Sequence, residues 1–220
     1  MGTHPPSPHV GASILQSGSP LEQATGAVIL LHGRGGSAED ILMLGSELRL
    51  PGVGFLAPQA AAHTWYPNSF LAPIESNEPW LTSALELVYG LTSRCAAAGI
   101  GIERVAIMGF SQGACLACEF IARYPQRYGA LVAFTGGLIG PIGSDLHHTG
   151  TLLGTPVLLS SGDPDPHVPW KRVQETAKEL AAMGAIIHTQ RYVGRPHTIL
   201  PEELQAARSL LEPVFPLPAN

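Results

Sequence analysis

Short apolar runs alternate with helix-forming segments along most of the chain, and this alternation limits the folds that the chain can adopt. Several of the runs are continuously apolar, which is typical of strands buried on both faces of a parallel sheet. The pattern predicts strands at residues 11–16, 27–31, 54–57, 105–110, 130–134, 156–160 and 185–193. It predicts helices at residues 38–48, 80–98, 112–123, 169–183 and 201–211.

Strand–helix alternation of this kind predicts an α/β fold, with a central, mostly parallel sheet covered by helices on both faces. We assign residues 11–215 to this single domain and residues 1–10 to a flexible, proline-rich N-terminal segment. The segments between the predicted elements are too short to form a large cap domain. Because ligands of such sheets bind beyond the carboxyl ends of the strands, we expect the chemistry in the residues that follow each strand.

Composition and charge narrow the possible partners. The chain has 220 residues, of which 45% are hydrophobic and 13% charged, so a large core is available. A net charge of −5 without any cluster of basic residues argues against nucleic acid and against stable association with a membrane. The odd number of cysteines and the absence of a secretory signal pattern predict a cytoplasmic protein. These features neither favour nor exclude a homodimer.

A serine between two glycines lies where a predicted strand ends and a predicted helix begins, in the segment GFSQG at residues 109–113. This is the context of a nucleophile elbow, a sharp strand–turn–helix that holds a serine in a strained, exposed position. Gly109 and Gly113 are small, so strand and helix can pass close to each other there. The helix N-terminus directs free N–H groups toward negative charge on an attacked carbonyl. We interpret Ser111 as a nucleophile and the N–H of Gln112 as an oxyanion donor.

A serine nucleophile requires a base and an acid that orients the base, in the chain order serine, acid, histidine for this topology. His197 follows the last predicted strand and is the predicted base. His188 lies inside that strand, and His167 belongs to the loop that carries the candidate acids. The acid is expected after the strand at 156–160, where Asp163 and Asp165 both occur. These considerations do not separate the two aspartates.

Four segments together resemble the phospholipase/carboxylesterase family of small α/β-hydrolases, relatives of the acyl-protein thioesterases. The segments are LHGRG at 31–35, GFSQG at 109–113, GDPDPHVP at 162–169 and GRPH at 194–197. In the family pattern G-x-x-D-x-x-V-P the acid is the aspartate three residues after the glycine, so the resemblance implies Asp165. The family pattern H-G-x-G implies that the backbone N–H of Arg34 is the second oxyanion donor.

The resemblance implies a serine-dependent carboxylic ester hydrolase that works through an acyl-enzyme, without a cofactor or a metal, on a small-molecule ester. Within this class, an acyl thioesterase, a lysophospholipase and a hydrolase of aromatic ring-fission products are alternatives. A rival of a different class is a non-catalytic binding module with the same fold. The rival predicts that a member of the triad is missing, and none is missing here.

The substrate pocket is predicted from two loops that follow strands. Trp65 and Tyr66 lie in a proline-broken loop that we expect to form one wall, and Leu138 lies in the loop at 136–141 that we expect opposite. Proteins similar to acyl-protein thioesterases usually carry an apolar residue where this chain has Arg34. A guanidinium there argues against a long acyl channel. We expect an open, shallow site for short acyl esters, or for substrates with a carboxylate or phenolic group.

Overall fold

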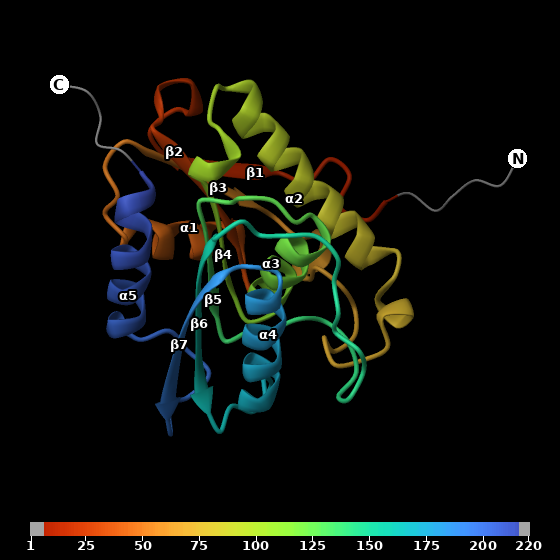
Figure 1. Cartoon of the computed structure of the whole chain (residues 1–220). Coiled ribbons are helices and arrows are strands. Elements are labelled where there is room, and N and C mark those ends of the chain that lie inside the picture. Colours follow the sequence, from red (N-terminus) through yellow and green to blue (C-terminus); the bar gives the residue numbers. More distant parts are fainter. Residues whose placement is uncertain (1–6, 216–220) are drawn as a thin grey trace, which may run out of the picture.

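A seven-stranded sheet runs through the centre of the computed structural model, which describes residues 7–215 (Figure 1). The strand order is β1-β3-β2-β4-β5-β6-β7, and only β1 runs antiparallel to its neighbour. The strands are β1 (Ile14–Gly18), β2 (Gly26–Leu31), β3 (Val53–Pro58), β4 (Val105–Phe110), β5 (Ala130–Phe134), β6 (Pro156–Asp163) and β7 (Ile186–Val193). The predicted mostly parallel sheet is therefore confirmed.

Helices cover both faces of this sheet, as Figure 1 shows. Helices α1 (Ala38–Ser46) and α5 (Pro201–Leu211) pack on one face and share a hydrophobic core with it. Three helices pack on the other face and enclose the larger core, namely α2 (Trp80–Ala97), α3 (Gln112–Arg123) and α4 (Trp170–Ala182). Every residue of β2, β3 and β5 is buried, because both faces of these strands meet a helix layer.

The bounds of β4, β5, α3 and α5 agree with the predicted ones. Strand β6 is longer than predicted: it continues to Asp163, because its parallel ladder with β7 extends from Pro156 and Ile186 to Asp163 and Val193. Strand β1 begins at Ile14 rather than at residue 11, where its ladder with β3 begins. The longer β6 matters for the site, since it places Asp163 on the strand and Asp165 beyond it.

The N-terminal prediction requires a correction. Residues 1–6 lie outside the described residues, but residues 7–10 pack against the domain instead of being flexible. His9 is 3% exposed; its Nε2 donates to the carbonyl oxygen of Trp65 at 3.0 Å, and its Nδ1 accepts from the N–H of Ala61 at 3.1 Å. Burial lowers the pKa of His9, which favours this neutral form. The packed domain therefore includes residues 7–10.

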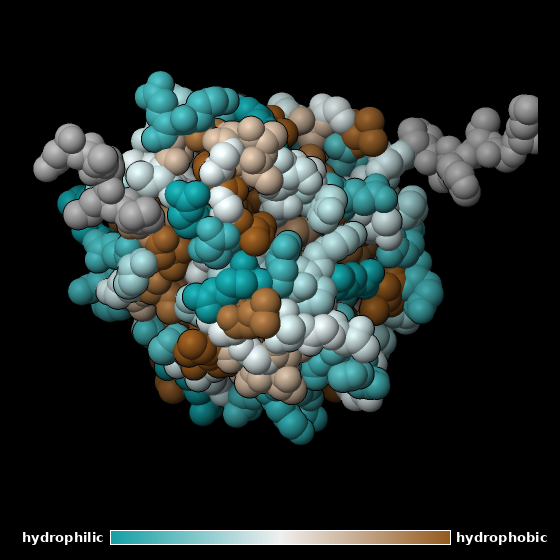
Figure 2. All heavy atoms as spheres, turned by 45° about the horizontal axis from the view of Figure 1, so that its top comes forward, coloured by the Kyte–Doolittle hydropathy of each residue, from teal (hydrophilic) through white to brown (hydrophobic). Residues whose placement is uncertain are grey.

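Figure 2 shows exposed hydrophobic side chains scattered among polar ones, with no broad apolar surface on this face. Single hydrophobic residues exposed in this way are normal for a folded domain. Within residues 7–215, no helix combines the length and the apolar character that crossing a membrane requires.

Candidate active site

Ser111 lies in the turn between β4 and α3, and its backbone is strained there, with φ of 54° and ψ of −118°. Non-glycine residues rarely adopt a positive φ, and such strain concentrates at functional sites. The flanking glycines are required by close packing: a Cβ at Gly109 would collide with the backbone of Gly113, and a Cβ at Gly113 with the carbonyl of Leu31. The elbow geometry predicted for this segment is therefore present.

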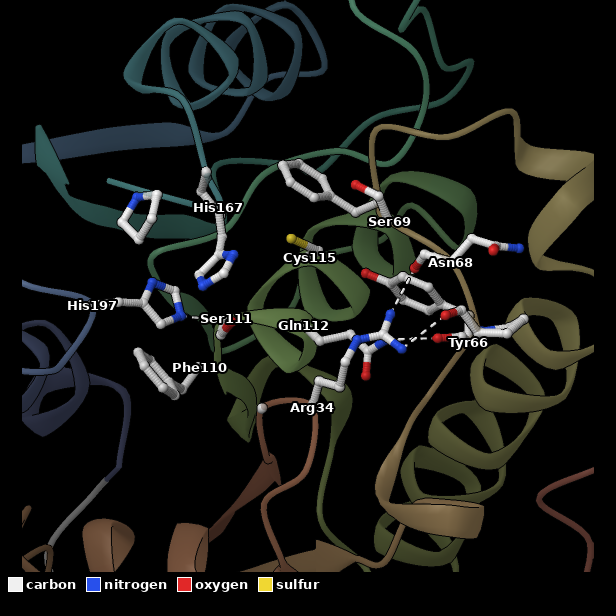
Figure 3. A pocket seen from close by; sticks show the side chains of 15 residues that line it. Arg34, Tyr66, Asn68, Ser69, Phe110, Ser111, Gln112, Cys115, His167 and His197 are labelled. Carbon is white, nitrogen blue, oxygen red and sulfur yellow. Dashed lines mark hydrogen bonds between the residues drawn. The ribbon is translucent and has the colours of Figure 1, made fainter. Parts of the chain in front are cut away.

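His197 lies beside the serine in the loop that follows β7. Its Nε2 lies 2.9 Å from Oγ of Ser111 (Figure 3), and its Nδ1 lies 2.8 Å from Oδ2 of Asp165. The Asp165 side chain is fully buried, and its Oδ1 accepts from the N–H groups of His167 and Val168, both at 2.9 Å. Burial opposes the charge of Asp165, but hydrogen bonds from His197 and from these N–H groups outweigh it and lower its pKa. An ionised carboxylate thus holds the histidine.

Asp163, the other candidate acid, points elsewhere. It is the last residue of β6 and forms an ion pair with Arg191 of β7, with its side chain 23% exposed. Asp163 pairs with Val193 in the ladder, so Arg191, two residues earlier on β7, lies on the same face of the sheet and within reach of its carboxylate. The structure thus brings Asp165, and not Asp163, to His197.

The loop that carries His197 is attached to the sheet by a buried arginine. The Arg195 side chain is 2% exposed; it donates to the carbonyl oxygens of Pro196, at 3.2 Å, and Thr198, which flank the histidine. It also donates to Oγ1 of Thr135, at 2.6 Å, directly after β5. The backbone on both sides of His197 is therefore tied to the centre of the sheet.

Glu203, on the first turn of α5, supplies the counter-charge for Arg195. It is fully buried, with Oε2 at 3.4 Å from Nε of Arg195, an ion pair without hydrogen-bond alignment at Nε. Its carboxylate also accepts from the N–H of Leu200, at 2.9 Å, and bonds the hydroxyl of Ser160 on β6. Burying two charges is costly unless they are paired and hydrogen-bonded, and this pair meets both conditions.

The glycine-rich turn after β2 lies on the other side of Ser111. The N–H of Gly35 donates to the carbonyl of His63 at 2.8 Å, whereas the N–H of Arg34 has no hydrogen-bonding partner within residues 7–215. His32 is buried and joins the turn to its surroundings, since its Nδ1 contacts Gly33 O at 2.7 Å and its Nε2 accepts from Ala60 N–H at 3.1 Å. Burial lowers the pKa of His32, so the ring stays neutral and acts as a structural link in the turn.

The side chains of Gln112 and Arg34 both bind the segment 64–68. Gln112 Oε1 accepts from the N–H of Trp65 at 3.0 Å, and its Nε2 donates to the carbonyl of Tyr66 at 2.7 Å. Arg34 Nη1 donates to Oγ1 of Thr64 at 2.9 Å, and the same hydroxyl lies 3.2 Å from the Gln112 amide. The hydroxyl of Thr64 therefore forms hydrogen bonds with both residues that are predicted to donate to an oxyanion.

These elements enclose a cavity of about 690 Å³, within the range of small-molecule sites. Its lining residues are Gly33, Arg34, Tyr66, Pro67, Asn68, Ser69, Phe70, Phe110, Ser111, Gln112, Cys115, Pro166, His167, Val168 and His197. Tyr66 is part of this wall, as predicted. Trp65 is not: it is fully buried, and its indole N–H donates to the carbonyl of His32 at 2.8 Å. A buried indole needs such an acceptor, and this one lies in the core.

The prediction for Leu138 is also wrong. None of residues 136–141 lines the cavity, and Leu138 is fully buried. The buried guanidinium of Arg172 on α4 binds the carbonyls of Leu138 and Gly140, both at 2.8 Å, and so holds this loop against the helix. The loop instead supports the wall from behind, since the N–H of Gly140 donates to the carbonyl of Phe70 at 2.8 Å.

Phe110, His167 and Cys115 line the cavity although no pocket role is predicted for them from the sequence. The rings of Phe110 and His167 lie 5.1 and 4.8 Å from the ring of His197. Phe110 lies within the GFSQG motif and His167 within GDPDPHVP, so the motifs themselves point to both residues. Cys115 follows Ser111 by one helical turn; burial raises the pKa of its thiol to about 12, so it stays protonated.

A strained serine at a strand–helix elbow, with a histidine and an aspartate brought in from later loops, defines the class of α/β-hydrolases. Within residues 7–215 no three His, Cys, Asp or Glu side chains come together as a metal site. The family model described as Phospholipase/Carboxylesterase matches residues 13–214. The chain belongs to this family, which confirms the resemblance.

Individual relatives agree with this assignment. The crystal structure of a phospholipase/carboxylesterase from Dyadobacter fermentans is 45% identical with a TM-score of 0.87, covering 91% of this chain and 96% of that one. A probable carboxylesterase SOBER1-like of Arabidopsis thaliana is 32% identical over 62% of this chain and 52% of its own length. Acyl-protein thioesterase 1 of Saccharomyces cerevisiae is 32% identical over 52% and 51%. The chain thus spans about half the length of these curated relatives.

Proposed function

We propose that the chain is a serine-dependent carboxylic ester hydrolase that acts through an acyl-enzyme. The observation that carries the proposal is the hydrogen-bonded series from Ser111 Oγ through the His197 ring to Asp165, at 2.9 and 2.8 Å. These are the distances that proton transfer from a serine to a base requires. The names of the relatives, carboxylesterase and phospholipase, support the same reaction class.

In this mechanism His197 Nε2 takes the hydroxyl proton while Ser111 Oγ attacks the carbonyl carbon of the ester. The N–H groups of Gln112 and Arg34 hold the oxyanion, and Asp165 stabilises the imidazolium. His197 then gives its proton to the departing alkoxide, which leaves as the alcohol. A water molecule, deprotonated by His197, attacks the acyl-enzyme and releases the acid and free Ser111.

The primary test is the variant Ser111→Ala with p-nitrophenyl acetate and butyrate as substrates. We expect kcat to fall by about 10³-fold or more, because no other group in the cavity forms the acyl-enzyme. A fluorophosphonate probe, followed by mass spectrometry, should modify Ser111 in the wild type and nothing in the variant. Near-normal kcat in folded Ser111→Ala would end the proposal, and a wild type that neither hydrolyses these esters nor reacts with the probe would favour a non-catalytic module of this fold.

An acyl thioesterase is the second candidate, favoured by the relatives named acyl-protein thioesterase 1. The dependence of kcat/KM on acyl-chain length distinguishes a short-chain esterase from a thioesterase with a long acyl channel. Each added methylene that enters an apolar channel contributes roughly 0.8 kcal/mol, so a thioesterase with a long channel should show kcat/KM rising steadily with chain length. We expect a maximum at about two to four carbons, because Arg34, Asn68 and Ser69 place polar groups on the wall. A profile still rising at eight to ten carbons would favour the thioesterase.

A further inference from the structure

The guanidinium of Arg34 is held in a fixed position on the cavity wall. It donates to Oγ1 of Thr64 and the carbonyl of Pro67, both at 2.9 Å, and to the carbonyl of Asn68 at 2.6 Å. Figure 3 shows it in the cavity between Gln112 and Tyr66, with the hydrogen bonds to Pro67 and Asn68 dashed. A guanidinium fixed in this way loses little conformational entropy when it binds a further group.

This cation has no counter-charge among the residues that the structure describes. Within residues 7–215, no carboxylate lies within ion-pair distance of Arg34, although the chain carries a net charge of −5. Of the described residues that line the cavity, none is an aspartate or a glutamate. The cavity wall is therefore cationic in a protein that is acidic as a whole.

The guanidinium of Arg34 also keeps N–H donors that bind no other group among residues 7–215. A guanidinium carries five N–H donors, and the three hydrogen bonds use both on Nη1 and one on Nη2. The Nε donor and the second Nη2 donor stay free of protein partners within residues 7–215. Two donors on one guanidinium match the two oxygens of a carboxylate.

Building on the proposed ester hydrolysis, we infer that the enzyme selects esters that carry an ionised carboxylate, which the Arg34 guanidinium binds. The backbone of the same residue is the proposed oxyanion donor, so the carboxylate and the reacting carbonyl are at most one arginine side chain apart. Monoesters of short dicarboxylic acids and acyl esters of small hydroxy acids have this spacing. The first group carries the carboxylate on the acyl side and the second on the alcohol side.

Two pairs of substrates test the inference, each with an anionic ester and a neutral partner of similar size. Monomethyl glutarate is compared with methyl pentanoate for the acyl side, and 3-acetoxybenzoate with its methyl ester for the alcohol side. The readout is the ratio of kcat/KM for the anionic ester to that for the neutral one. In the wild type we expect this ratio to be about 5 or more in one pair, falling as salt is raised.

Variants separate charge recognition from support of the wall. Arg34→Gln should lower the ratio to about 1 or below, and Arg34→Lys, which keeps the charge, should retain part of the preference. Arg127→Gln is the matched control, because Arg127 is also exposed and donates to two loop carbonyls, those of Leu153 and Gly154, and does not line the cavity. It should leave the ratio unchanged.

Two results would overturn the inference while leaving ester hydrolysis intact. One is a wild-type ratio near or below 1 in both pairs. The other is an equal loss for anionic and neutral esters in Arg34→Gln, which would make Arg34 a support of the wall alone. If the wild type hydrolyses none of the four esters and Ser111 resists the fluorophosphonate probe, the proposed function itself fails, and the inference with it.

Discussion

On one side of Ser111 the site is held by hydrogen bonds without an ion pair, and on the other by a buried ion pair. The oxyanion side comprises residues 33–36, segment 64–68 and Gln112, which amide, hydroxyl and carbonyl groups and one exposed arginine join together. The acid–base side comprises residues 163–168 and 194–203, where Arg195 and Glu203 are almost fully removed from solvent.

The difference follows from what each side has to hold. The proposed oxyanion donors are backbone N–H groups next to the elbow, so short hydrogen bonds within neighbouring turns are sufficient to place them. The histidine, by contrast, lies in a loop after an edge strand and must be held in register with a serine 86 residues earlier. A charged guanidinium that bonds several backbone carbonyls can fix such a loop. Substitutions should therefore affect the two sides differently.

The largest effect on the acid–base side is expected from Asp165→Asn. An asparagine there favours the wrong tautomer of His197, and kcat should fall by roughly 10³- to 10⁴-fold. Asp163→Asn, which removes only the ion pair with Arg191, should change kcat by less than about 3-fold. Steady-state kinetics of both variants with p-nitrophenyl butyrate make the comparison. Similar losses in the two variants would show that the aspartates share the role.

The buried ion pair should be the main stability difference between the two sides. Arg195→Met leaves the Glu203 carboxylate buried without its cation, so the free energy of unfolding should fall by about 3 kcal/mol or more, and kcat should fall with it. Arg208→Met removes an exposed pair with Glu212 and should cost less than about 1 kcal/mol. Urea unfolding measures both. A loss below 1 kcal/mol in Arg195→Met would contradict the role assigned to the pair.

A smaller effect is expected from loosening the oxyanion side. Thr64→Val removes the hydroxyl that bridges Arg34 and Gln112, so the two proposed donors are held less firmly. We expect kcat to fall by about 3- to 10-fold with a smaller change in KM, in line with the loss of one or two hydrogen bonds. Thr151→Val, distant from the cavity, is the control and should leave kcat unchanged. A rise in KM at constant kcat would instead assign Thr64 to substrate binding.

The smallest effect is a pH dependence that only the acid–base side should show. The folded-state pKa of Asp165 is lowered, so its stabilisation is complete above the unfolded value of about 3.9 and is lost as pH falls through the folded value. The difference in unfolding free energy between wild type and Asp165→Asn should therefore shrink as pH falls from 5 toward 3. For Thr64→Val the difference should stay constant, since no carboxylate takes part in its contacts. Parallel curves for both variants would contradict this assignment.

The sequence by itself determined the elements and the order of the site residues. Continuous apolar runs such as β4, and the glycines on either side of Ser111, have local causes: burial on two faces of a strand, and steric limits at a tight turn. The same is true of the sheet class, and of Ser111 and His197, which follow strand ends. The local pattern does not distinguish Asp163 from Asp165, because both follow the same strand, and only the resemblance to the family pattern indicated Asp165 as the acid.

Only the tertiary structure decided which side chains meet. Trp65 and Tyr66 are neighbours in sequence, yet Trp65 turns into the core toward His32 while Tyr66 lines the cavity. Leu138 is held in the core by a hydrogen bond from Arg172 on α4. Arg195 pairs with the carboxylate of Glu203 on α5, the helix that follows its loop. These choices depend on contacts between residues far apart in the chain. No local pattern encodes them, because burial of each polar group is decided by partners that folding brings to it.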